Sequence, residues 1–286
     1  MSLRDDIEML AATIGERNLA RYASLRRAAD YIASRLGTVE RQAFDVDELR
    51  CENLIHEVQG SVRPKEIVVI GAHYDSVFGS PGANDNATGV AALLALAATV
   101  SKPARTVRFA AFVNEEPPYF TTEAMGSLVY ARRCHERGEK IVAMLSLETI
   151  GFYSDAANSQ AYPVPLSLIY PAVGNFIGFV SNVRSAGLLR RVVKSFRAHT
   201  DFPAESIAAP DLIPGIGWSD QWSFWQCGYP AVMVTDTALY RDPTYHTARD
   251  TPEHIDYDRL ERVVEGLRGA VGDLSGGPSG RPYSSP

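Results

Sequence analysis

Four short apolar runs, each followed at once by polar residues, constrain the fold of this chain more than any other feature. They are EIVVIGAHYDS, TVRFAAFVNEE, IVAMLSLETIGF and GYPAVMVTD, beginning at positions 66, 106, 141 and 228. Strands that are covered on both faces are apolar along their whole length rather than at every second residue. Helix-like stretches such as VAALLALAATV and GSLVYARRCHERG lie between the runs. This alternation predicts an α/β protein with helices packed around a mostly parallel sheet.

The chain on either side of these runs adds further helices and one irregular segment. Apolar residues recur at helical spacing over 4–36, and a last amphipathic helix is expected over 257–274. The stretches QAFDVDE and CENLIHEVQG are typical of strands. Residues 152–217 are rich in Pro, Gly, Ser and Asn, with one helical stretch near 186–198. We expect this segment to form an irregular excursion beside the active site.

Length and charge favour one large domain without a nucleic-acid partner. The chain has 286 residues, of which 45% are hydrophobic, so we expect a single domain over 1–274. The Gly/Ser/Pro-rich stretch over 275–286 predicts a disordered tail. The formal net charge is −6, and Lys and Arg are scattered rather than clustered. Scattered cations of this kind usually belong to solvated helix faces.

Cysteine content and hydropathy favour a cytoplasmic enzyme. Cys51, Cys134 and Cys227 are too few and too far apart for a disulfide framework. The N-terminal stretch MSLRDDIEML has no apolar core of a signal peptide, although removal of a natural leader stays open. No apolar run reaches the roughly 18 residues that a membrane span needs. We therefore expect a cytoplasmic protein without a membrane partner.

Residues that bind metals follow several of the predicted strands. In open α/β sheets, ligands bind beyond the carboxyl ends of the strands, so side chains that follow successive strands lie close together. Two residues spaced i and i+2 on a strand also share a face. The candidates at this edge are His73, Asp75, Asp85, Glu115, Glu116, Glu148 and His246.

Two imidazoles and several carboxylates at one edge point to a bound cation. Zinc takes histidine nitrogen and carboxylate oxygen, and a catalytic zinc site keeps one position open for water. A set of two His and at least three carboxylates exceeds what one tetrahedral zinc needs. It suits two metal ions that share a bridging carboxylate.

Taken singly, each of these residues has an ordinary structural explanation. A histidine at a strand end is more often a hydrogen-bonded or surface residue than a ligand. Asp85 alone fits an Asx-turn or the N-cap of the next helix, and Glu115-Glu116 alone fits an exposed strand end. Glu148 differs, because an unpaired charge is costly in its apolar setting, MLSLETIG. Their joint occurrence at successive strand ends is what favours a metal site.

Five blocks of the sequence, in this order, resemble the two-zinc aminopeptidases of the bacterial leucyl-aminopeptidase-like family. The blocks are GAHYDSV, GANDNATGVAALLALA, FVNEEPPYFTTEAMGS, LETIGFY and PTYHTARDTPEHIDYDRL, and the resemblance covers roughly 65–275. The superfamily also includes glutaminyl cyclases and glutamate carboxypeptidases. The resemblance implies a three-layer α/β/α sandwich around a mixed, mostly parallel sheet. It also implies a zinc-dependent exopeptidase that hydrolyses N-terminal peptide bonds of substrates with a free N-terminus.

The resemblance also implies a set of metal ligands for two zinc ions per chain. Asp85 matches the carboxylate that bridges both ions. Glu116 and His246 match the ligands of one zinc, and His73 and Glu148 match those of the other. Many relatives have Asp at the position of Glu148, but Glu is also a zinc ligand.

Three further residues match positions with catalytic roles in the family. Glu115 matches the general base, which takes a proton from the attacking water and passes it to the leaving amine. Asp75 matches the carboxylate that orients the imidazole of His73, as metal-bound histidines generally require. Tyr245 matches a hydroxyl that holds the developing oxyanion in some relatives.

The backbone must turn where the two adjacent glutamates stand. Neighbouring strand residues face opposite ways, so Glu115 and Glu116 can serve one site only if the strand ends before them. The Pro117-Pro118 pair that follows favours such a break, because proline cannot extend a ladder and restricts the residue before it.

Two rival functions and one sequence departure stay open. One rival is a glutaminyl cyclase-like acyltransferase on the same fold, which uses one zinc; the other is a non-catalytic metal-binding module. Where many relatives have Ser-Asp-His, this chain has Ser219-Asp220-Gln221, which bears on substrate choice. An apolar pocket walled by WSDQWSFW competes with ordinary packing of these aromatic residues. The sequence does not give the oligomeric state, the physiological peptide or the metal used in the cell.

Overall fold

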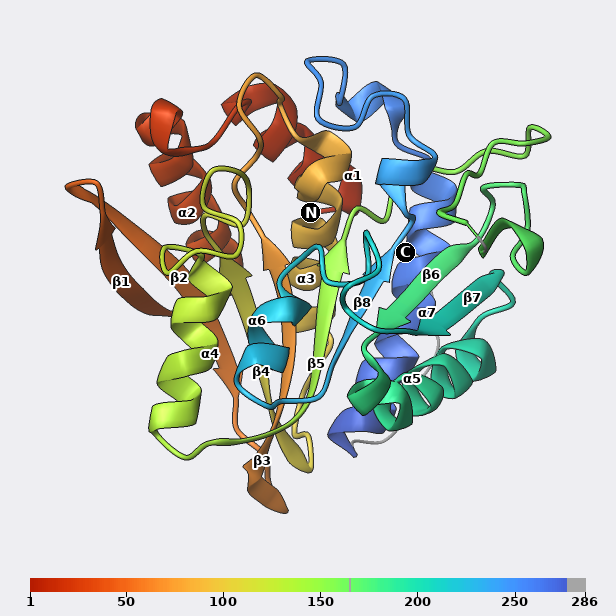
Figure 1. Cartoon of the computed structure of the whole chain (residues 1–286). Helices are drawn as coiled ribbons and strands as arrows, with labels where there is room; N and C mark the ends of the chain where they lie inside the picture. The colour runs from red at the N-terminus through yellow and green to blue at the C-terminus, as the bar shows by residue number, and fades with distance from the viewer. Residues whose placement is uncertain (165, 277–286) are drawn as a thin grey trace.

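The computed structural model describes residues 1–164 and 166–276 and contains one sheet of eight strands (Figure 1). Neighbouring strands follow the order β1-β2-β4-β3-β5-β8-β6-β7. The strands are β1 (Glu40–Val46), β2 (Leu49–Val58), β3 (Arg63–His73), β4 (Arg105–Phe112), β5 (Lys140–Glu148), β6 (Ile177–Ser181), β7 (Ala204–Ala208) and β8 (Ala231–Thr235).

Four adjacent strands in the middle of the sheet, β4, β3, β5 and β8, run parallel to one another. Strands β2 and β6 flank them in the antiparallel sense. The register pairs His73 with Phe112 and Glu148 with Thr235, so these parallel strands end close to one line. The sheet is therefore mixed, as expected, and the loops after its central strands share one edge, the upper edge in Figure 1.

Helices cover both faces of the sheet, which makes the three-layer α/β/α sandwich that the sequence predicts. Figure 1 shows α4 and α6 in front of the sheet and α3 and α7 behind it. Strand β3 shows why both faces need cover, because Val68 and Ile70 pack into one core and Ile67 and Val69 into the other. The helices are α1 (Leu3–Ile7), α2 (Tyr22–Leu36), α3 (Gly89–Ala97), α4 (Gly126–Glu136), α5 (Ala186–His199), α6 (Gln221–Gln226) and α7 (Tyr257–Ser275).

The N-terminal helical region is broken in the middle, contrary to the continuous pattern over 4–36. Gly15 ends the first helical stretch with a φ of 79°, a positive value that glycine adopts more readily than other residues. Helix α2 begins only at Tyr22. A short connecting segment, Gly15–Asn18, therefore leaves the helical layer and approaches the sheet.

The segment over 152–217 is more regular than expected. It contains the predicted helix, α5, but also two five-residue strands, β6 and β7. Strand β6 pairs with β8 and β7 pairs with β6, so both extend the sheet at its edge. Strands this short depend on their neighbours in the sheet more than on local sequence, which explains why the pattern did not show them.

Two further expectations concern the chain ends and membranes. The predicted disordered tail lies outside the described residues from position 277 onward. Within 1–164 and 166–276, no helix has both the length and the apolar character that crossing a bilayer requires.

Candidate metal centre

The first half of the candidate centre is built around His73, the last residue of β3. Its Nε2 atom lies 3.2 Å from Oδ1 of Asp85 and 3.2 Å from Oε2 of Glu148, which ends the neighbouring strand β5. All three side chains are buried. An imidazole nitrogen and two carboxylate oxygens thus converge from two adjacent strand ends and one loop.

The second half is built around His246, from the loop after β8. Its Nε2 atom lies 3.0 Å from Oδ2 of Asp85 and 3.4 Å from Oε2 of Glu116. Asp85 therefore turns one carboxylate oxygen to each imidazole. The arrangement contains two groups of donors that share a single carboxylate.

Asp250, four residues after His246, holds the loop that carries Asp85. Its Oδ1 accepts the backbone N–H of Asn84 at 2.7 Å, and its Oδ2 accepts that of Asp85 at 3.1 Å. Its main-chain carbonyl accepts the N–H of Ala83 as well. One carboxylate thus ties the His246 loop to the Asp85 loop. Asp250 is an acidic residue in the YHTARD stretch, but no pattern in the sequence marks the backbone N–H groups that it accepts.

Asp75 accepts two consecutive backbone N–H groups in the same way as Asp250 does. Its two carboxylate oxygens accept the backbone N–H groups of Glu115 at 3.2 Å and Glu116 at 3.1 Å. The contact to Nδ1 of His73 comes from the main-chain carbonyl of Asp75 at 3.2 Å, with carboxylate Oδ1 at 3.5 Å. The Asp75 carboxylate therefore positions the glutamate pair, while the hydrogen bond to His73 comes from the main chain of Asp75.

The glutamate pair divides between the two halves of the centre. Strand β4 ends at Phe112, and Asn114 has a φ of 58°, so the chain turns before the pair as expected. Glu116 points Oε2 to His246, and its Oε1 accepts the N–H of Val77 at 3.1 Å. Oε2 of Glu115 lies 3.9 Å from Nε2 of His73. Glu115 is therefore beside the donor groups without joining either of them as closely as the other carboxylates do.

Electrostatics in the centre favour a bound cation. Burial raises the pKa of Glu115, Glu116 and Glu148, because their charged forms lose water and repel one another. Burial works against the charged form of His73, but the surrounding carboxylates outweigh it and raise the pKa of that imidazole. Burial likewise opposes ionisation of Asp85, yet the two imidazoles lower its pKa. Metal ions in place of these protons would neutralise the crowded carboxylates.

The donor set fits zinc. Histidine nitrogen and carboxylate oxygen are the ligands that zinc takes in catalytic sites. One atom each from His73, Asp85 and Glu116 lies within 4.8 Å of the other two, so the two halves of the centre lie close together. Residues with the same donor atoms, Glu148 and His246, complete the two groups.

The Ser219-Asp220-Gln221 segment contacts the centre through Ser219 and a pocket-lining residue through Gln221. Ser219 donates its hydroxyl to Oε2 of Glu148 at 2.7 Å. Burial raises the pKa of Asp220 to about 7. Gln221 is fully buried and donates Nε2 to the carbonyl of Ile216 at 3.1 Å. The amide of Gln221 therefore supports a wall of the neighbouring pocket, which Ile216 lines.

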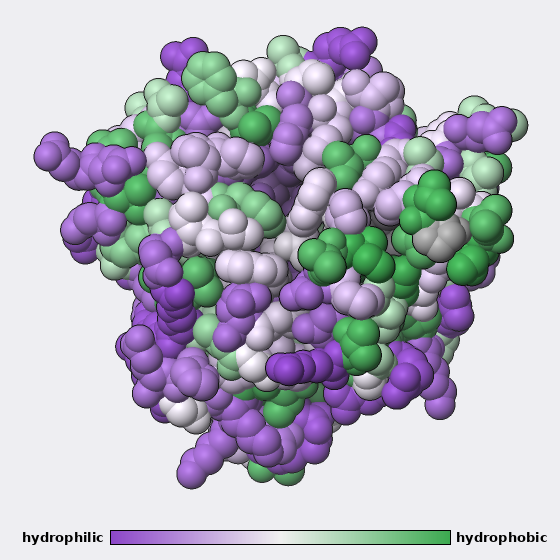
Figure 2. Space-filling model, in the orientation of Figure 1, coloured by the Kyte–Doolittle hydropathy of each residue, from purple (hydrophilic) through white to green (hydrophobic). Residues whose placement is uncertain are grey.

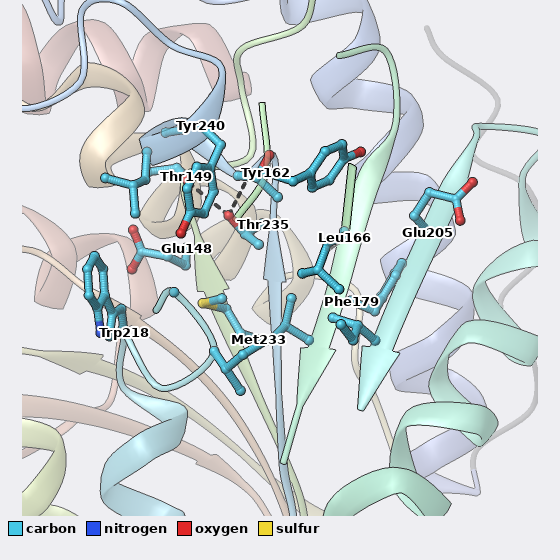
Figure 3. A pocket seen from close by; sticks show the side chains of 18 of the residues that line it. Glu148, Thr149, Tyr162, Leu166, Phe179, Glu205, Trp218, Met233, Thr235 and Tyr240 are labelled. Atoms are coloured by element: carbon cyan, nitrogen blue, oxygen red, sulfur yellow. Dashed lines mark hydrogen bonds between the residues drawn. The ribbon is translucent and has the colours of Figure 1, made fainter. Parts of the chain in front are cut away.

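An apolar pocket opens next to the centre, with a volume of about 850 Å³ including its open mouth. Figure 3 shows Glu148 and Trp218 at one end of it and Glu205 at the other. Tyr162 and Leu166 line it from the 152–217 segment. Apolar side chains also gather on this face of the molecule (Figure 2). Of the aromatic residues in WSDQWSFW, the lining includes only Trp218 among the described residues, while Phe224 and Trp225 belong to the core.

Tyr245 connects the pocket to the second half of the centre. It lines the pocket, and its ring stacks on the imidazole of His246 with centroids 3.8 Å apart and an interplanar angle of 19°. Burial and the nearby carboxylates raise the pKa of Tyr245, so its hydroxyl keeps its proton near neutral pH. Such a hydroxyl can donate a hydrogen bond to a negatively charged oxygen.

Two known proteins resemble this chain in sequence. The chain is 35% identical over 280 residues to the uncharacterized protein YfbL of Escherichia coli strain K12, covering 93% of this chain and 85% of that protein. It is 26% identical over 229 residues to a probable leucine aminopeptidase 1 of Trichophyton verrucosum, covering 74% of this chain but only 56% of that protein.

Two solved structures show the same fold. A zinc aminopeptidase from Bacillus subtilis superimposes with a TM-score of 0.72 at 16% identity, covering 95% of this chain and 94% of that one. A glutaminyl cyclase from Porphyromonas gingivalis superimposes with a TM-score of 0.73 at 18% identity, covering 96% and 97%. The sequence pattern of Peptidase family M28 matches residues 53–271. The chain therefore belongs to Peptidase family M28.

Proposed function

We propose that this protein is a zinc-dependent aminopeptidase that removes single residues from peptides with a free N-terminus. The observation that carries the proposal is the position of Asp85, whose two oxygens each face one imidazole. A carboxylate stands beside each imidazole, Glu148 beside His73 and Glu116 beside His246. This is the arrangement that two metal ions with a shared carboxylate require.

The two donor groups define which residues would hold each zinc. His73 and Glu148 would hold one ion and His246 and Glu116 the other, and Asp85 belongs to both groups. Zinc in such a site lowers the pKa of a water molecule and polarises the carbonyl of the scissile bond. The family and the zinc aminopeptidase of the same fold support this choice of metal.

Glu115 is the group that moves protons in this proposal. It lies beside His73 without being among the close donors, and burial raises its pKa. A carboxylate within reach of the attacking water can act as a general base. Glu115 would accept the proton of the attacking water and return it to the leaving amine. Asp75 positions it through the backbone N–H. Tyr245 would donate its hydroxyl to the oxygen that gains charge during the attack.

The apolar pocket would receive the first side chain of the peptide. It begins at Glu148 and Tyr245, so a side chain bound there leaves its own carbonyl next to the centre. Its walls include Trp218, Leu239 and Tyr240, which favour an apolar or aromatic residue through burial. We therefore infer a preference for peptides that begin with such residues.

The second candidate is glutaminyl cyclase chemistry, because a cyclase shares the fold with a TM-score of 0.73. A cyclase releases ammonia from an N-terminal glutamine instead of cleaving a peptide bond. The second donor group, His73 with Asp85 and Glu148, favours the peptidase, because a cyclase that uses one zinc ion needs only one such group.

A substrate panel distinguishes the candidates. The panel holds leucine anilide, the same anilide with an acetylated α-amine, and a peptide that begins with glutamine. The peptidase releases aniline from the free substrate alone and produces no cyclic product from glutamine. Ammonia release from the glutaminyl peptide without anilide hydrolysis would instead establish the cyclase, and no turnover of any substrate would favour a binding module.

A further inference from the structure

A buried arginine outside the family match contacts the metal loop. Arg17 lies in the short Gly15–Asn18 connection between the first helical stretch and α2, ahead of the matched region that begins at residue 53. Its side chain is completely buried. A buried cation is costly unless its donors are satisfied, so its partners show what it stabilises.

The guanidinium of Arg17 joins both ends of one loop. Its Nε donates to the carbonyl of Tyr74 at 2.7 Å, directly after His73. At the other end, Nη1 donates to the carbonyl of Pro81 at 2.5 Å and Nη2 to that of Gly82 at 2.7 Å. The loop between these acceptors connects His73 to Asp85. Arg17 thus closes the base of the chain segment that separates two of the proposed ligands.

The main chain around Arg17 adds to this clamp. The N–H of Arg17 donates to the hydroxyl of Ser76 at 3.1 Å, and its carbonyl accepts the N–H of Ser76 at 2.9 Å. Glu16 accepts the N–H of Gly79 at 3.0 Å, and the Asn18 amide donates to the carbonyl of Ser76 at 3.1 Å. Three consecutive residues therefore fasten the same loop at several points along its length.

Gly82 shows how close this approach is. A Cβ atom at that position would lie 3.1 Å from Nη2 of Arg17 and 2.3 Å from the carbonyl oxygen of Asp85. The φ of Gly82 is 63°, in the region that glycine adopts most readily. The sequence thus provides glycine where the arginine and the metal loop meet.

The charge of Arg17 also suits its position. Within residues 1–164 and 166–276 it forms no ion pair with a carboxylate, since its donors go to carbonyl oxygens. Nevertheless, electrostatic attraction to nearby carboxylates favours its charged form; these carboxylates are Asp250, Asp75, Asp85 and Glu116. Burial lowers its pKa to about 10, so it remains charged at neutral pH. The guanidinium of Arg17 therefore places a positive charge near the carboxylates of the centre.

We propose that Arg17 is a positioning residue that sets the placement of His73 relative to Asp85 before metal binds. The inference rests on the proposed zinc centre and extends it to a part of the chain that the family match does not include. The N-terminal helical layer then does more than cover the sheet. It holds the zinc-binding loop through the Glu16–Asn18 segment, and the Arg17 side chain joins the two ends of that loop.

The test compares zinc affinity in Arg17→Met, Arg17→Lys and a matched control, Arg35→Met. Arg35 lies in the same helical layer and pairs with the buried Asp6 at 2.7 and 2.8 Å, and Asp6 lies outside the metal loop. Zinc dissociation constants are measured on the full chain by competition with a chromophoric chelator. Thermal unfolding of the metal-free proteins is recorded in parallel.

We expect Arg17→Met to weaken zinc binding by about 10- to 100-fold, the range found when residues that orient metal ligands are removed. Arg35→Met should lower the melting temperature of the metal-free protein but retain parental zinc affinity. Arg17→Lys should also bind zinc at least about tenfold more weakly, because a compact ammonium cannot reach both ends of the loop.

Parental zinc affinity in either Arg17 variant overturns the inference, as does an equal loss in Arg35→Met. If Arg17→Met does not fold, Arg17→Lys decides the matter on the same criterion. Absence of zinc binding by the parental protein is a separate result, because it refutes the proposed zinc function itself.

Discussion

The adjacent glutamates give the sharpest test of how roles are divided in the centre. Glu115→Gln keeps the shape of the side chain and the backbone N–H that donates to Asp75. The carboxylate that it removes lies 3.9 Å from His73, farther than the proposed ligand Glu148 at 3.2 Å. We therefore expect zinc content to stay at the parental level while kcat falls.

The size of this fall follows from the role of a general base. Such a group contributes about 10²- to 10⁴-fold to the rate. At about 1.36 kcal/mol per factor of ten, the loss corresponds to roughly 2.7–5.4 kcal/mol of transition-state stabilisation. KM should change little, because Glu115 is proposed to act on the water rather than on the substrate side chain.

Glu116→Gln should have the opposite pattern. The Glu116 carboxylate stands 3.4 Å from Nε2 of His246, so its loss weakens one zinc site directly. The assay combines zinc analysis of each purified variant with steady-state hydrolysis of leucine anilide. Glu123→Gln, a side chain 79% exposed on the loop after the pair, is the control and should match the parent in both measurements.

Two results would refute this reasoning. One is a Glu115→Gln enzyme that hydrolyses the anilide at the parental rate, which excludes Glu115 as the base. The other is a Glu115→Gln protein that loses zinc to the same extent as Glu116→Gln, which makes both residues ligands.

The remaining predictions concern the loop that holds Asp85 and the protons of the centre. Asp250→Asn leaves one of the two N–H groups at Asn84 and Asp85 without its acceptor, at a cost of about 1–3 kcal/mol. It should weaken zinc binding about 10- to 100-fold in the chelator competition. Unchanged zinc affinity would contradict the role of Asp250 in holding the Asp85 loop. The raised pKa values of His73 and Glu116 mean that the metal-free protein holds protons which zinc must displace, so affinity rises with pH. Calorimetric titration in two buffers of different ionisation enthalpy should show net proton release, and equal heats in both would contradict it.

The position of the site was predictable because of a rule of topology. His73 and Glu148 end neighbouring parallel strands. Once the apolar runs are assigned to parallel strands, the two side chains are expected at the same edge of the sheet. The turn before Glu115 was also predictable, because two prolines follow the pair and the strand ends at Phe112. In both places the local sequence was sufficient, because parallel strands bring their carboxyl ends to one edge and proline cannot extend a strand ladder.

The supporting contacts were not predictable from the same patterns. Asp250 and Arg17 act on backbone N–H and carbonyl groups of distant segments, and those groups are the same at every residue. No side-chain pattern in the sequence therefore marks the partner. The helix break at Gly15 places Arg17 next to the loop, but in the sequence it appears only as a single glycine within a helical pattern, which does not predict a break.

The most direct test of the account is a zinc titration of the metal-free full chain, followed by leucine anilide hydrolysis. The account predicts that the rate reaches its maximum at two zinc ions per chain, because Asp85 is shared by two donor groups. It also predicts that Asp85→Asn abolishes the activity at any zinc concentration in the titration. A maximum at one zinc ion per chain, with no further increase at two, would contradict the proposed two-metal centre.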